Sequence, residues 1–476
     1  MRRARDGRSR AIRGTTAALI VTCGALVHTA AAGAVADFPY PMPQPVSGDT
    51  AVHDPSIVVR PSGPRYGVFS TGPGIPVRDS TDRVNYSAAE RAFTIKQPWW
   101  ATYTNPDGTN PNNEDFLWAP DVSYQGNKYL MYYAASSFGS RKSAIGLATS
   151  ANGRSAADLG AWADQGIVIS STDTSPYNAI DPNLVVVSPT QWYLAYGSWN
   201  QGIYMVALDP ATGKRPLVSP PAPFKVAERP APDKSIEAAY VYHRGNYWYL
   251  FTSWGTCCKN RDKTTYNVRV GRSTSPTGGY VDRSGAPLLT GGGTLVLEGH
   301  DNLISAGHQG VFLDPADNRE RLYYHYYLNQ MPDYPNYLGI NVLNWTTDGW
   351  PYLMHDYGPK LPAPHRIFEQ DYLSSPSGQY TLKLQADCNL VERNAAGDAL
   401  WASDTWNLGT NCRLVVQPGG VVGIYDGATG NRIWDANNTA GTGDNNKLRL
   451  QDDGNIVVYD ASGTALCARF GTAPRC

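Results

Sequence analysis

The sequence predicts an all-β protein, and three observations support this fold class. The 476 residues include 47 Gly and 35 Pro, which suits many tight turns and disfavours long helices. Aromatic residues are abundant, with 30 Tyr and 13 Trp, and aromatic side chains are enriched in strands. The third observation is a repeat, because one β-rich unit recurs five times from residue 53 onward.

Each repeat starts with a short polar segment, its head, which is followed by an alternating apolar stretch, a turn and a Tyr-rich strand. The heads are 53–55, 119–121, 180–182, 236–238 and 307–309, and neighbouring heads start from 56 to 71 residues apart. Such a period is typical of a β-propeller, whose innermost strands converge on one pocket. We therefore expect a five-bladed β-propeller over 37–364, with three carboxylates and one imidazole facing a common cavity. These side chains belong to Asp54, Asp181, Glu237 and His308.

The rest of the chain differs from the propeller in composition. Residues 1–36 combine a basic start, a short apolar run and an A-x-A site, which predicts a secretory signal peptide that is removed. The apolar run is too short to span a bilayer. Pro-rich residues lead into a linker at 365–371, and a second repeat, of threefold design, occupies 372–476. We expect a secreted, extracellular protein that has no membrane association once the signal is removed.

The threefold repeat carries polar residues at alternating positions. Its third copy contains Gln451, Asp453, Asn455 and Tyr459, which share one face of a strand. Amides and carboxylates supply both donors and acceptors for vicinal sugar hydroxyls. We interpret this face as a sugar-binding site, and a solvated polar sheet face is the alternative.

Charge and cysteine content restrict the function further. The formal net charge is −1 and 17% of the residues are charged, which gives no electrostatic reason to bind nucleic acid or an anionic membrane. Six cysteines remain after signal removal, and in an oxidising compartment they predict disulfides. Cys388–Cys412 and Cys467–Cys476 are the candidate local pairs. The adjacent Cys257 and Cys258 form either a vicinal disulfide or two buried free thiols.

The propeller region resembles the glycoside hydrolases of family 43, and within them the endo-acting arabinan-degrading enzymes. The matching stretches are 53–56, 118–122, 178–183, 235–238, 253–258, 270–273, 278–282 and 307–308. The resemblance implies a general base at Asp54, a general acid at Glu237, and a third carboxylate at Asp181 that tunes the acid and orients the substrate. It also implies inverting hydrolysis of internal α-1,5-arabinofuranosidic bonds in arabinan or a related plant cell-wall polysaccharide.

The chemistry of these residue types agrees with the implied roles. Glycoside hydrolysis needs one protonated carboxyl to assist the leaving oxygen and one ionised carboxylate to activate water. In inverting enzymes the two lie roughly 6.5–9.5 Å apart, a gap that suits carboxyls from different blades. We expect Asp181 to raise the pKa of Glu237 by like-charge repulsion. Asp121 also heads a blade, and we interpret it as a structural residue that holds the inner strands together.

The same resemblance implies further contacts. The residues expected to touch substrate are Phe138, Gly139, Asn178, Ala179, Ile180, Ser198, Trp199 and Asn200. His308 is expected to contact calcium or another cation in the central channel. Waters would complete its shell, because imidazole is a poor ligand for a hard cation. The alternative is a core histidine that is hydrogen-bonded across the channel. No organic cofactor is expected.

Residues 372–476 resemble the bulb-type, mannose-binding lectins of the β-prism II fold. Under this resemblance the sugar-binding residues are Gln451, Asp453, Asn455 and Tyr459, because only the third copy keeps the whole motif. The resemblance also implies a glycan partner for this domain and a disulfide between Cys388 and Cys412.

Two other functions stay open on the sequence. An exo-acting arabinosidase, or another family 43 hydrolase active on xylan or galactan, would share the propeller, and the loops around the funnel decide between an open cleft and a blind pocket. A purely carbohydrate-binding protein would be expected to lack one catalytic carboxylate, whereas all three are present.

Overall fold

The computed structural model describes residues 40–474, with gaps. The gaps are 63–64, 157–161, 259–263, 301–302, 329–335, 347, 355–359, 363–365, 369–371, 418–420, 437–445 and 472–473. The expected signal peptide and Cys476 lie outside the described residues, so the Cys467–Cys476 pairing stays a prediction. In the part of the chain that is described, no helix is long and apolar enough to cross a membrane. The predicted all-β class is confirmed, since strands dominate and the α-helix α1 covers only Ala101–Thr104.

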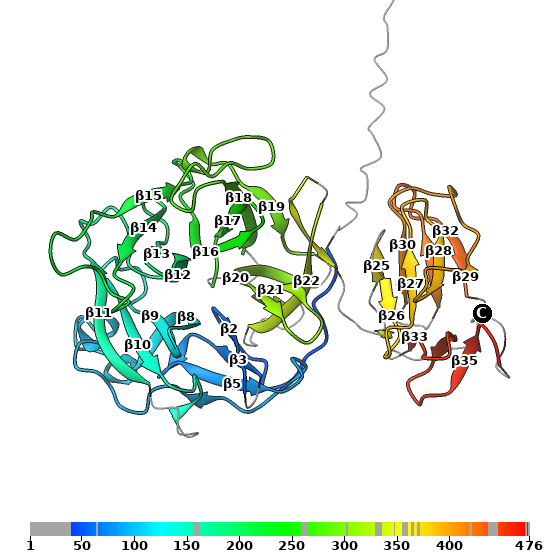
Figure 1. The fold of residues 1–476 in the computed structure, drawn as a ribbon, viewed down its shortest axis with the longest axis horizontal. Helices are drawn as coiled ribbons and strands as arrows, with labels where there is room; N and C mark the ends of the chain where they lie inside the picture. Colours follow the sequence, from blue (N-terminus) through cyan, green and yellow to red (C-terminus); the bar gives the residue numbers. More distant parts are fainter. Residues whose placement is uncertain are drawn as a thin grey trace, which may run out of the picture. The chain divides into compact units, whose positions relative to one another are not determined.

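Residues up to Met354 form five antiparallel sheets, the blades, in which consecutive strands pair (Figure 1). Blade 1 contains β2 (Ser56–Val59), β3 (Tyr66–Phe69), β5 (Pro76–Ser80) and β7 (Glu90–Arg91). Blade 2 contains β8 (Phe116–Gln125), β9 (Lys128–Ala135), β10 (Ser143–Ser150) and β11 (Ala163–Ser171), with the short β4 (Gly72–Pro73) beside β8. Blade 3 contains β12 (Asn183–Ser188), β13 (Gln191–Tyr196), β14 (Ile203–Leu208) and β15 (Phe224–Ala227). Blade 4 contains β16 (Ile236–Arg244), β17 (Tyr247–Trp254), β18 (Asn267–Ser273) and β19 (Thr294–Leu297), and blade 5 contains β20 (Leu303–Asp314), β21 (Arg319–Leu328), β22 (Tyr337–Trp345) and β23 (Pro351–Met354).

The five blades close into a ring. The first strand of each blade contacts the first strands of its two neighbours, in the order β2, β8, β12, β16, β20 and back to β2. Figure 1 shows these five strands innermost. The predicted five-blade repeat is therefore present. The heads 53–55, 180–182 and 236–238 lie at or beside the start of an innermost strand, and the heads 119–121 and 307–309 lie within β8 and β20.

Side chains join the innermost strands across the blade boundaries. Asp121 on β8 accepts hydrogen bonds from the Leu184 amide (2.7 Å) and the Asn183 side chain (3.2 Å) at β12. Asn183 in turn accepts the Val241 amide of β16 at 2.8 Å. The structural interpretation of Asp121 is therefore confirmed. Burial raises the pKa of this carboxyl to about 6, and the hydrogen bonds from Leu184 and Asn183 oppose that shift.

The start of the described chain is attached to blade 5. The Gln44 amide donates to the Ile340 carbonyl at 2.8 Å, and the Leu338 amide donates to the Thr50 carbonyl at 3.0 Å. The Val52 amide donates to the Asn336 carbonyl, also at 3.0 Å. We call residues 44–52 the N-terminal strap, because they connect blade 1 to β22 of the last blade.

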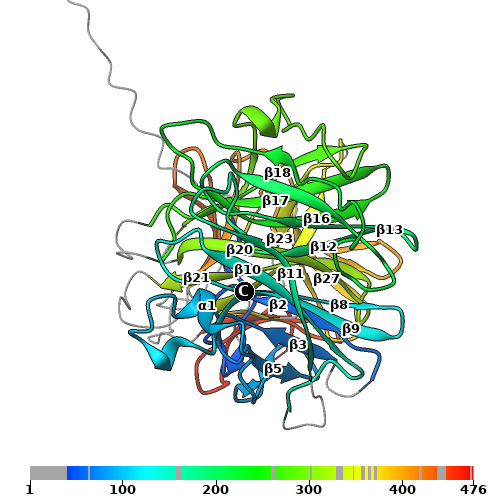
Figure 2. The same cartoon turned by 90° about the vertical axis from the view of Figure 1, so that its left-hand side faces the viewer.

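The many tyrosines fill the spaces between blades. Tyr132 of blade 2 lies in an apolar layer with Leu194 of blade 3 and donates its hydroxyl to the Gly213 carbonyl at 2.6 Å. Tyr240 of blade 4 likewise donates to the Val311 carbonyl of blade 5 at 2.8 Å. A buried ring that carries a satisfied hydroxyl suits such an interface. Figure 2 views the propeller from the flank on which β10 and β11 lie side by side.

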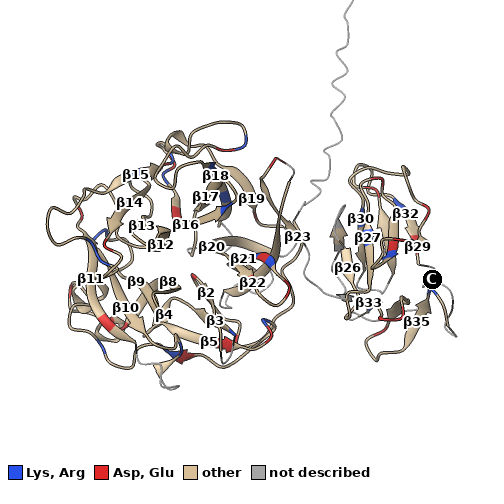
Figure 3. Cartoon of the chain, in the orientation of Figure 1, with Lys and Arg blue, Asp and Glu red and all other residues tan. Residues whose placement is uncertain are grey.

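Charged residues are sparse on the strands. Lys and Arg are interspersed with Asp and Glu along the ribbon, and long stretches of strand carry neither (Figure 3). This pattern follows from the low charged fraction of 17%.

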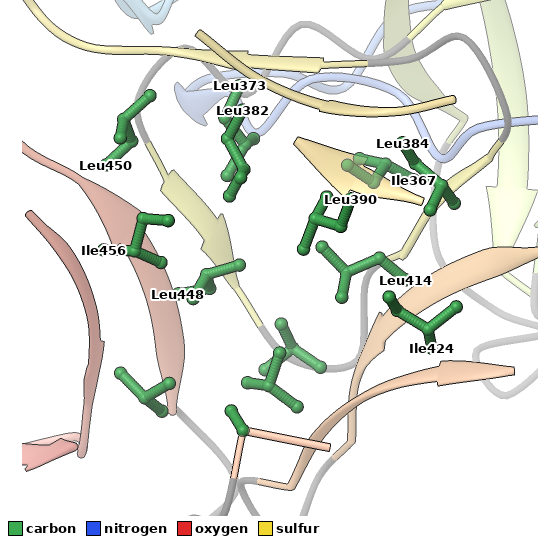
Figure 4. Packing of buried hydrophobic residues seen from close by; sticks show 14 of the residues in the cluster. Ile367, Leu373, Leu382, Leu384, Leu390, Leu414, Ile424, Leu448, Leu450 and Ile456 are labelled. Atoms are coloured by element: carbon green, nitrogen blue, oxygen red, sulfur yellow. The ribbon is translucent and has the colours of Figure 1, made fainter. Parts of the chain in front are cut away.

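The C-terminal domain consists of three four-stranded sheets, which matches the predicted threefold design. The first contains β26 (Tyr372–Ser374), β27 (Tyr380–Leu384), β28 (Leu390–Asn394) and β29 (Ala399–Ala402). The second contains β25 (Arg366–Phe368), β30 (Arg413–Val416), β31 (Val422–Tyr425) and β32 (Arg432–Asp435), and the third contains β24 (Lys360–Pro362), β33 (Lys447–Leu450), β34 (Ile456–Tyr459) and β35 (Ala465–Ala468). Leu382, Leu414 and Leu448 occupy equivalent strands of the three sheets and meet in one apolar core (Figure 4). A disulfide joins Cys388 to Cys412 in this core.

The structure corrects the predicted domain boundary. Residues 365–371 were expected to be a linker, but β25 lies in this segment and pairs with β30. The strand β24 precedes it and pairs with β33, so the C-terminal domain already includes Lys360. The Pro-rich composition suggested a linker because Pro interrupts sheet hydrogen bonding. Pro362, however, lies at the end of an edge strand, where a missing N–H is tolerated.

Candidate active site

The candidate site is built from the heads of the blades. Asp54 precedes β2, Asp181 precedes β12, Glu237 lies at the start of β16, and His308 lies within β20. His308 Nδ1 lies 3.0 Å from Oδ1 of Asp54, and Oδ2 of Asp181 accepts the amide of Ala238, next to Glu237, at 3.0 Å. The Gln309 side chain, next to His308, donates to the Ala238 carbonyl at 2.8 Å, so the heads lie together. The side chains of the four residues therefore converge as the repeat predicted.

Backbone strain recurs at the same position of every blade. One residue per head has a positive φ, namely Asp54 (49°), Ala119 (33°), Asp181 (56°), Ala238 (54°) and His308 (51°). The pairing register shifts at this position in β8, β16 and β20. Bulges of this kind redirect a side chain, and strained residues cluster at functional sites.

Asp54 lies in a polar environment that favours its ionised form. The Thr71 hydroxyl donates to Oδ2 at 2.6 Å, and His53 Nδ1 lies 2.7 Å from the same oxygen. His308 Nδ1 lies 3.0 Å from Oδ1. Burial alone would raise the pKa of Asp54, but the imidazoles of His53 and His308 outweigh it and hold the pKa well below its ordinary value. Asp54 is therefore a carboxylate at neutral pH.

Glu237 lies in the opposite environment. Burial is the largest cause that raises its pKa above the ordinary value, and Asp54 adds to the shift. Hydrogen bonds from the Ser198 hydroxyl, at 2.7 Å from Oε2, and from Tyr266 oppose it. The expectation that repulsion from Asp181 raises this pKa names the wrong leading cause, because desolvation contributes most.

Asp181 connects the heads of blades 3 and 4. Its Oδ2 accepts the Ala238 amide at 3.0 Å, next to Glu237 in the sequence. Burial raises the pKa of Asp181 to about 7; Glu237 and Asp54 add to the shift, and His308 opposes it. Two neighbouring buried carboxyls with raised pKa values retain protons toward neutral pH, which is the condition that a general acid requires.

His308 pairs with Asp54 across the site. Desolvation disfavours its charged form, but Asp54, Asp181 and Glu237 outweigh this effect and raise the pKa of His308 to about 9. Its Nδ1 faces Asp54, so a cation would have to bind Nε2. In the described chain, the one group of three or more His, Cys, Asp or Glu side chains close enough to share an ion does not include His308. At neutral pH a histidine with this raised pKa carries a proton on Nε2, so binding of the expected hydrated cation would require loss of that proton, and the cation stays a prediction.

The group that could share an ion consists of His53, Cys257 and His325. In this structure it is not a metal site, because Cys257 is bonded to Cys258 in a vicinal disulfide. His325 Nδ1 also accepts the Asp54 amide at 3.0 Å, which places the imidazole proton on Nε2, the nitrogen that faces the sulfur.

The residues expected to touch substrate fall into two groups. Phe138 and Trp199 are exposed by 67% and 39%, and exposed aromatic faces can stack on a sugar. Phe138 also packs edge-to-face against Trp118. Asn178, Ala179 and Ile180 are buried, and Ser143 donates to the Asn178 side chain at 2.7 Å. Gly139 adopts a φ of 82°, and the Asn200 side chain donates to the Ser198 carbonyl at 3.0 Å. Ser198 itself contacts Glu237, so its first role is to hold a carboxyl.

Sequence reasoning missed four residues of the site, namely His53, Thr71, Tyr266 and His325. His53 directly precedes Asp54, and His325 interrupts the Tyr-rich stretch 323–327, so both gave a weak signal. Thr71 and Tyr266 gave none, because only the fold brings them to the carboxyls. Tyr266 also lines a hollow of about 450 Å³, together with Thr264, Asn267, Glu298 and Ser305.

The predicted sugar site of the C-terminal domain is largely satisfied internally. The Gln451 amide donates to the Tyr459 hydroxyl at 2.7 Å, and Asp453 accepts the Asn455 amide at 2.9 Å. The side chain of Asn455 exchanges two hydrogen bonds with the backbone of Phe470. Asp453 is exposed and offers its remaining acceptors to solvent.

Comparisons with known proteins agree on one family. Residues 43–351 match the model of the glycosyl hydrolases family 43. The probable arabinan endo-1,5-α-L-arabinosidase A of Aspergillus flavus is 38% identical over 345 residues, which cover 70% of this chain and 97% of that protein. The α-L-arabinanase of Cellvibrio cellulosa, solved with arabinohexaose, is 31% identical with a TM-score of 0.57, covering 64% of this chain and 96% of its own. An exo-1,5-α-L-arabinanase from a bovine ruminal metagenomic library is 32% identical with a TM-score of 0.57, covering 65% and 99%.

Proposed function

The chain belongs to glycosyl hydrolases family 43, and from this premise we propose that it is a secreted endo-1,5-α-L-arabinanase that cleaves internal bonds of arabinan with inversion. One observation carries the proposal: two carboxyls in one buried site have opposite pKa shifts. Asp54 is held ionised and Glu237 is held toward its protonated form. An inverting glycoside hydrolase needs this pair.

In the proposed mechanism Asp54 is the general base. Its carboxylate takes a proton from a water molecule as that water attacks the anomeric carbon. Thr71 and His53 hold Oδ2 by contacts of 2.6 and 2.7 Å, and His308 contacts Oδ1. These contacts orient the carboxylate and keep it ionised before substrate arrives. His308 would hold a hydrated calcium or other cation through Nε2 once that nitrogen has lost its proton, and the ion would supply further positive charge beside the site.

Glu237 is the general acid of the proposal. Its proton passes to the glycosidic oxygen as the bond to the anomeric carbon breaks. Asp181 assists in two ways, since it fixes the backbone beside Glu237 through the Ala238 amide and its charge is coupled to that of Glu237. Asp181 is therefore proposed to orient and tune the acid without touching the leaving group.

The C-terminal domain is proposed to bind a glycan and so to deliver the propeller to its substrate. The exposed Asp453 and the bonded pair Gln451 and Tyr459 form the proposed sugar contacts. Asn455 contributes by holding the backbone at Phe470. The lectin resemblance and the threefold sheet arrangement support this part of the proposal.

An exo-acting arabinanase is the second candidate, because one similar solved structure carries that activity in its name. A product time course on debranched arabinan separates the two. A ladder of oligosaccharides is expected for endo action, whereas a single small product at all times would establish exo action. Following the anomeric configuration by NMR tests inversion, and a first product with retained configuration would exclude Asp54 as a general base.

A further inference from the structure

A disulfide lies beside the general base and has no role in the proposed hydrolysis. Cys257 and Cys258 are bonded to each other and are partly exposed, so small reagents can reach them. Cys258 Sγ lies 3.1 Å from His53 Nε2, and Cys257 Sγ lies 3.8 Å from the same nitrogen. A single imidazole thus separates the disulfide from the carboxylate of Asp54.

The two nitrogens of His53 have different partners. Nδ1 lies 2.7 Å from the Asp54 carboxylate, a close contact that does not have hydrogen-bond geometry. A proton on Nδ1 avoids placing its lone pair against this carboxylate, so in the neutral ring we assign the proton to Nδ1. The lone pair of Nε2 then faces Cys258. A disulfide sulfur has no proton to donate, so Cys258 gives no hydrogen bond to the Nε2 lone pair.

We propose that Cys257–Cys258 is a thiol-reactive site that is coupled to the general base through His53. A dithiol reductant breaks the S–S bond with two electrons, each sulfur receives a proton, and the dithiol becomes a cyclic disulfide. Cys258 then presents an S–H group to His53 Nε2. The order Asp54, His53, Cys258 is the carboxylate–imidazole–thiol arrangement that activates a cysteine nucleophile.

Reduction therefore has two consequences. The thiol proton of Cys258 moves to His53 Nε2, and the resulting thiolate is paired with an imidazolium, which favours rapid reaction with electrophiles. Attack on an alkylating agent forms an S–C bond and releases halide. The added group then occupies the space beside His53 and Asp54, so glycoside cleavage slows.

The second described disulfide provides an internal control. Cys388 and Cys412 are fully buried in the C-terminal core. We expect a dithiol to reduce Cys257–Cys258 well before Cys388–Cys412.

The test treats the full chain with dithiothreitol and then iodoacetamide, and follows peptide masses and arabinan hydrolysis together. We expect alkylation at Cys258 at a rate about tenfold or more above that of an ordinary thiol at neutral pH. Arabinan hydrolysis is expected to fall by about tenfold or more as the Cys258 modification completes. Full modification of Cys258 with unchanged hydrolysis would overturn the proposal. Loss of the near-UV circular dichroism on reduction alone would also overturn it, because the disulfide would then be a purely structural bond.

A variant tests the role of the His53 imidazole in the reactivity of Cys258. His53→Gln removes the base that faces the sulfur, so the reduced variant should alkylate Cys258 about tenfold more slowly. Equal alkylation rates in both proteins would remove His53 from the proposal. The Cys257→Ala/Cys258→Ala protein should not respond to the dithiol, and a response would locate the sensitive group elsewhere. The alkylation rates do not depend on the proposed hydrolase function. A failure of the proposed function can therefore be distinguished from a failure of the thiol-site proposal.

Discussion

The propeller and the C-terminal domain both consist of repeats, but the residues around the repeat axis are polar in the propeller and apolar in the C-terminal domain. In the propeller, polar residues from equivalent positions of different blades meet, and each position has acquired different chemistry: a low-pKa carboxylate, a buried acid and a histidine. In the C-terminal domain the axis is apolar, and equivalent Gln and Tyr side chains bond to each other within one sheet, as the matching bonds Gln417–Tyr425 and Gln451–Tyr459 illustrate. Where equivalent positions of the repeats meet, as in the propeller, different side chains can form one site. Where equivalent positions lie on different sheets, as in the C-terminal domain, each sheet can only carry a copy of the same site.

The largest loss of activity is expected from a substitution in the site where the blade heads meet. Glu237→Gln removes the acid but keeps the shape, so hydrolysis of arabinan should fall by about 10² to 10⁴. Aryl arabinosides whose leaving group needs no proton should retain much more activity. Kinetics on both substrates check this, and an equal loss on the two would argue against the acid role.

A smaller effect is expected from the residues that hold the acid. Ser198 donates to Glu237 and opposes its raised pKa, so Ser198→Ala should raise that pKa further. A general acid works only while protonated, so the alkaline limb of the kcat/KM profile should move to higher pH. The exposed Thr190→Ala serves as the control with an unchanged limb. A limb that stays in place in Ser198→Ala would show that this hydroxyl does not tune Glu237.

The C-terminal domain should matter for adsorption and not for chemistry. A chain that ends at Met354 keeps all five blades, so it should cleave soluble oligosaccharides at the normal rate and adsorb more weakly to an insoluble glycan. A chain that ends at residue 371 retains β24 and β25 without their partner strands, and we expect it to aggregate. Pull-down on insoluble arabinan and size-exclusion chromatography measure the two outcomes. Undiminished adsorption of the shorter chain would remove the targeting role.

The smallest effect concerns stability. The pKa of Asp181 is raised to about 7, whereas the unfolded chain ionises near its ordinary value, so folding retains a proton between about pH 4 and 7. The contribution of this group to stability therefore falls as pH rises through that window and stays low above it. Asp181→Asn should raise Tm by a few degrees at pH 8, with the gain shrinking toward pH 4. A gain of the same size at both pH values would contradict the linkage.

The sequence predicted those features that repeat. The heads of the blades were recognisable because Asp54, Asp181 and Glu237 recur at one position of a periodic pattern. The groups that set their pKa values were not, since Thr71 and Tyr266 reach the site only through folding and have no period of their own. The predicted start of the C-terminal domain differs from the structure for a related reason. Pro362 indicated a linker by composition, but a strand accepts a proline at the edge of a sheet, and the position of an edge depends on the tertiary structure.

The N-terminal strap has a consequence for how the molecule matures. Residues 44–52 are synthesised before any blade, whereas their partners Asn336, Leu338 and Ile340 follow almost 300 positions later in the chain. The contacts of the strap with blade 5 can therefore form only after nearly the whole propeller has been synthesised. Proteolytic trimming beyond residue 44 would undo that fastening, so the few residues between the predicted signal cleavage site and the strap set how much trimming the mature enzyme tolerates.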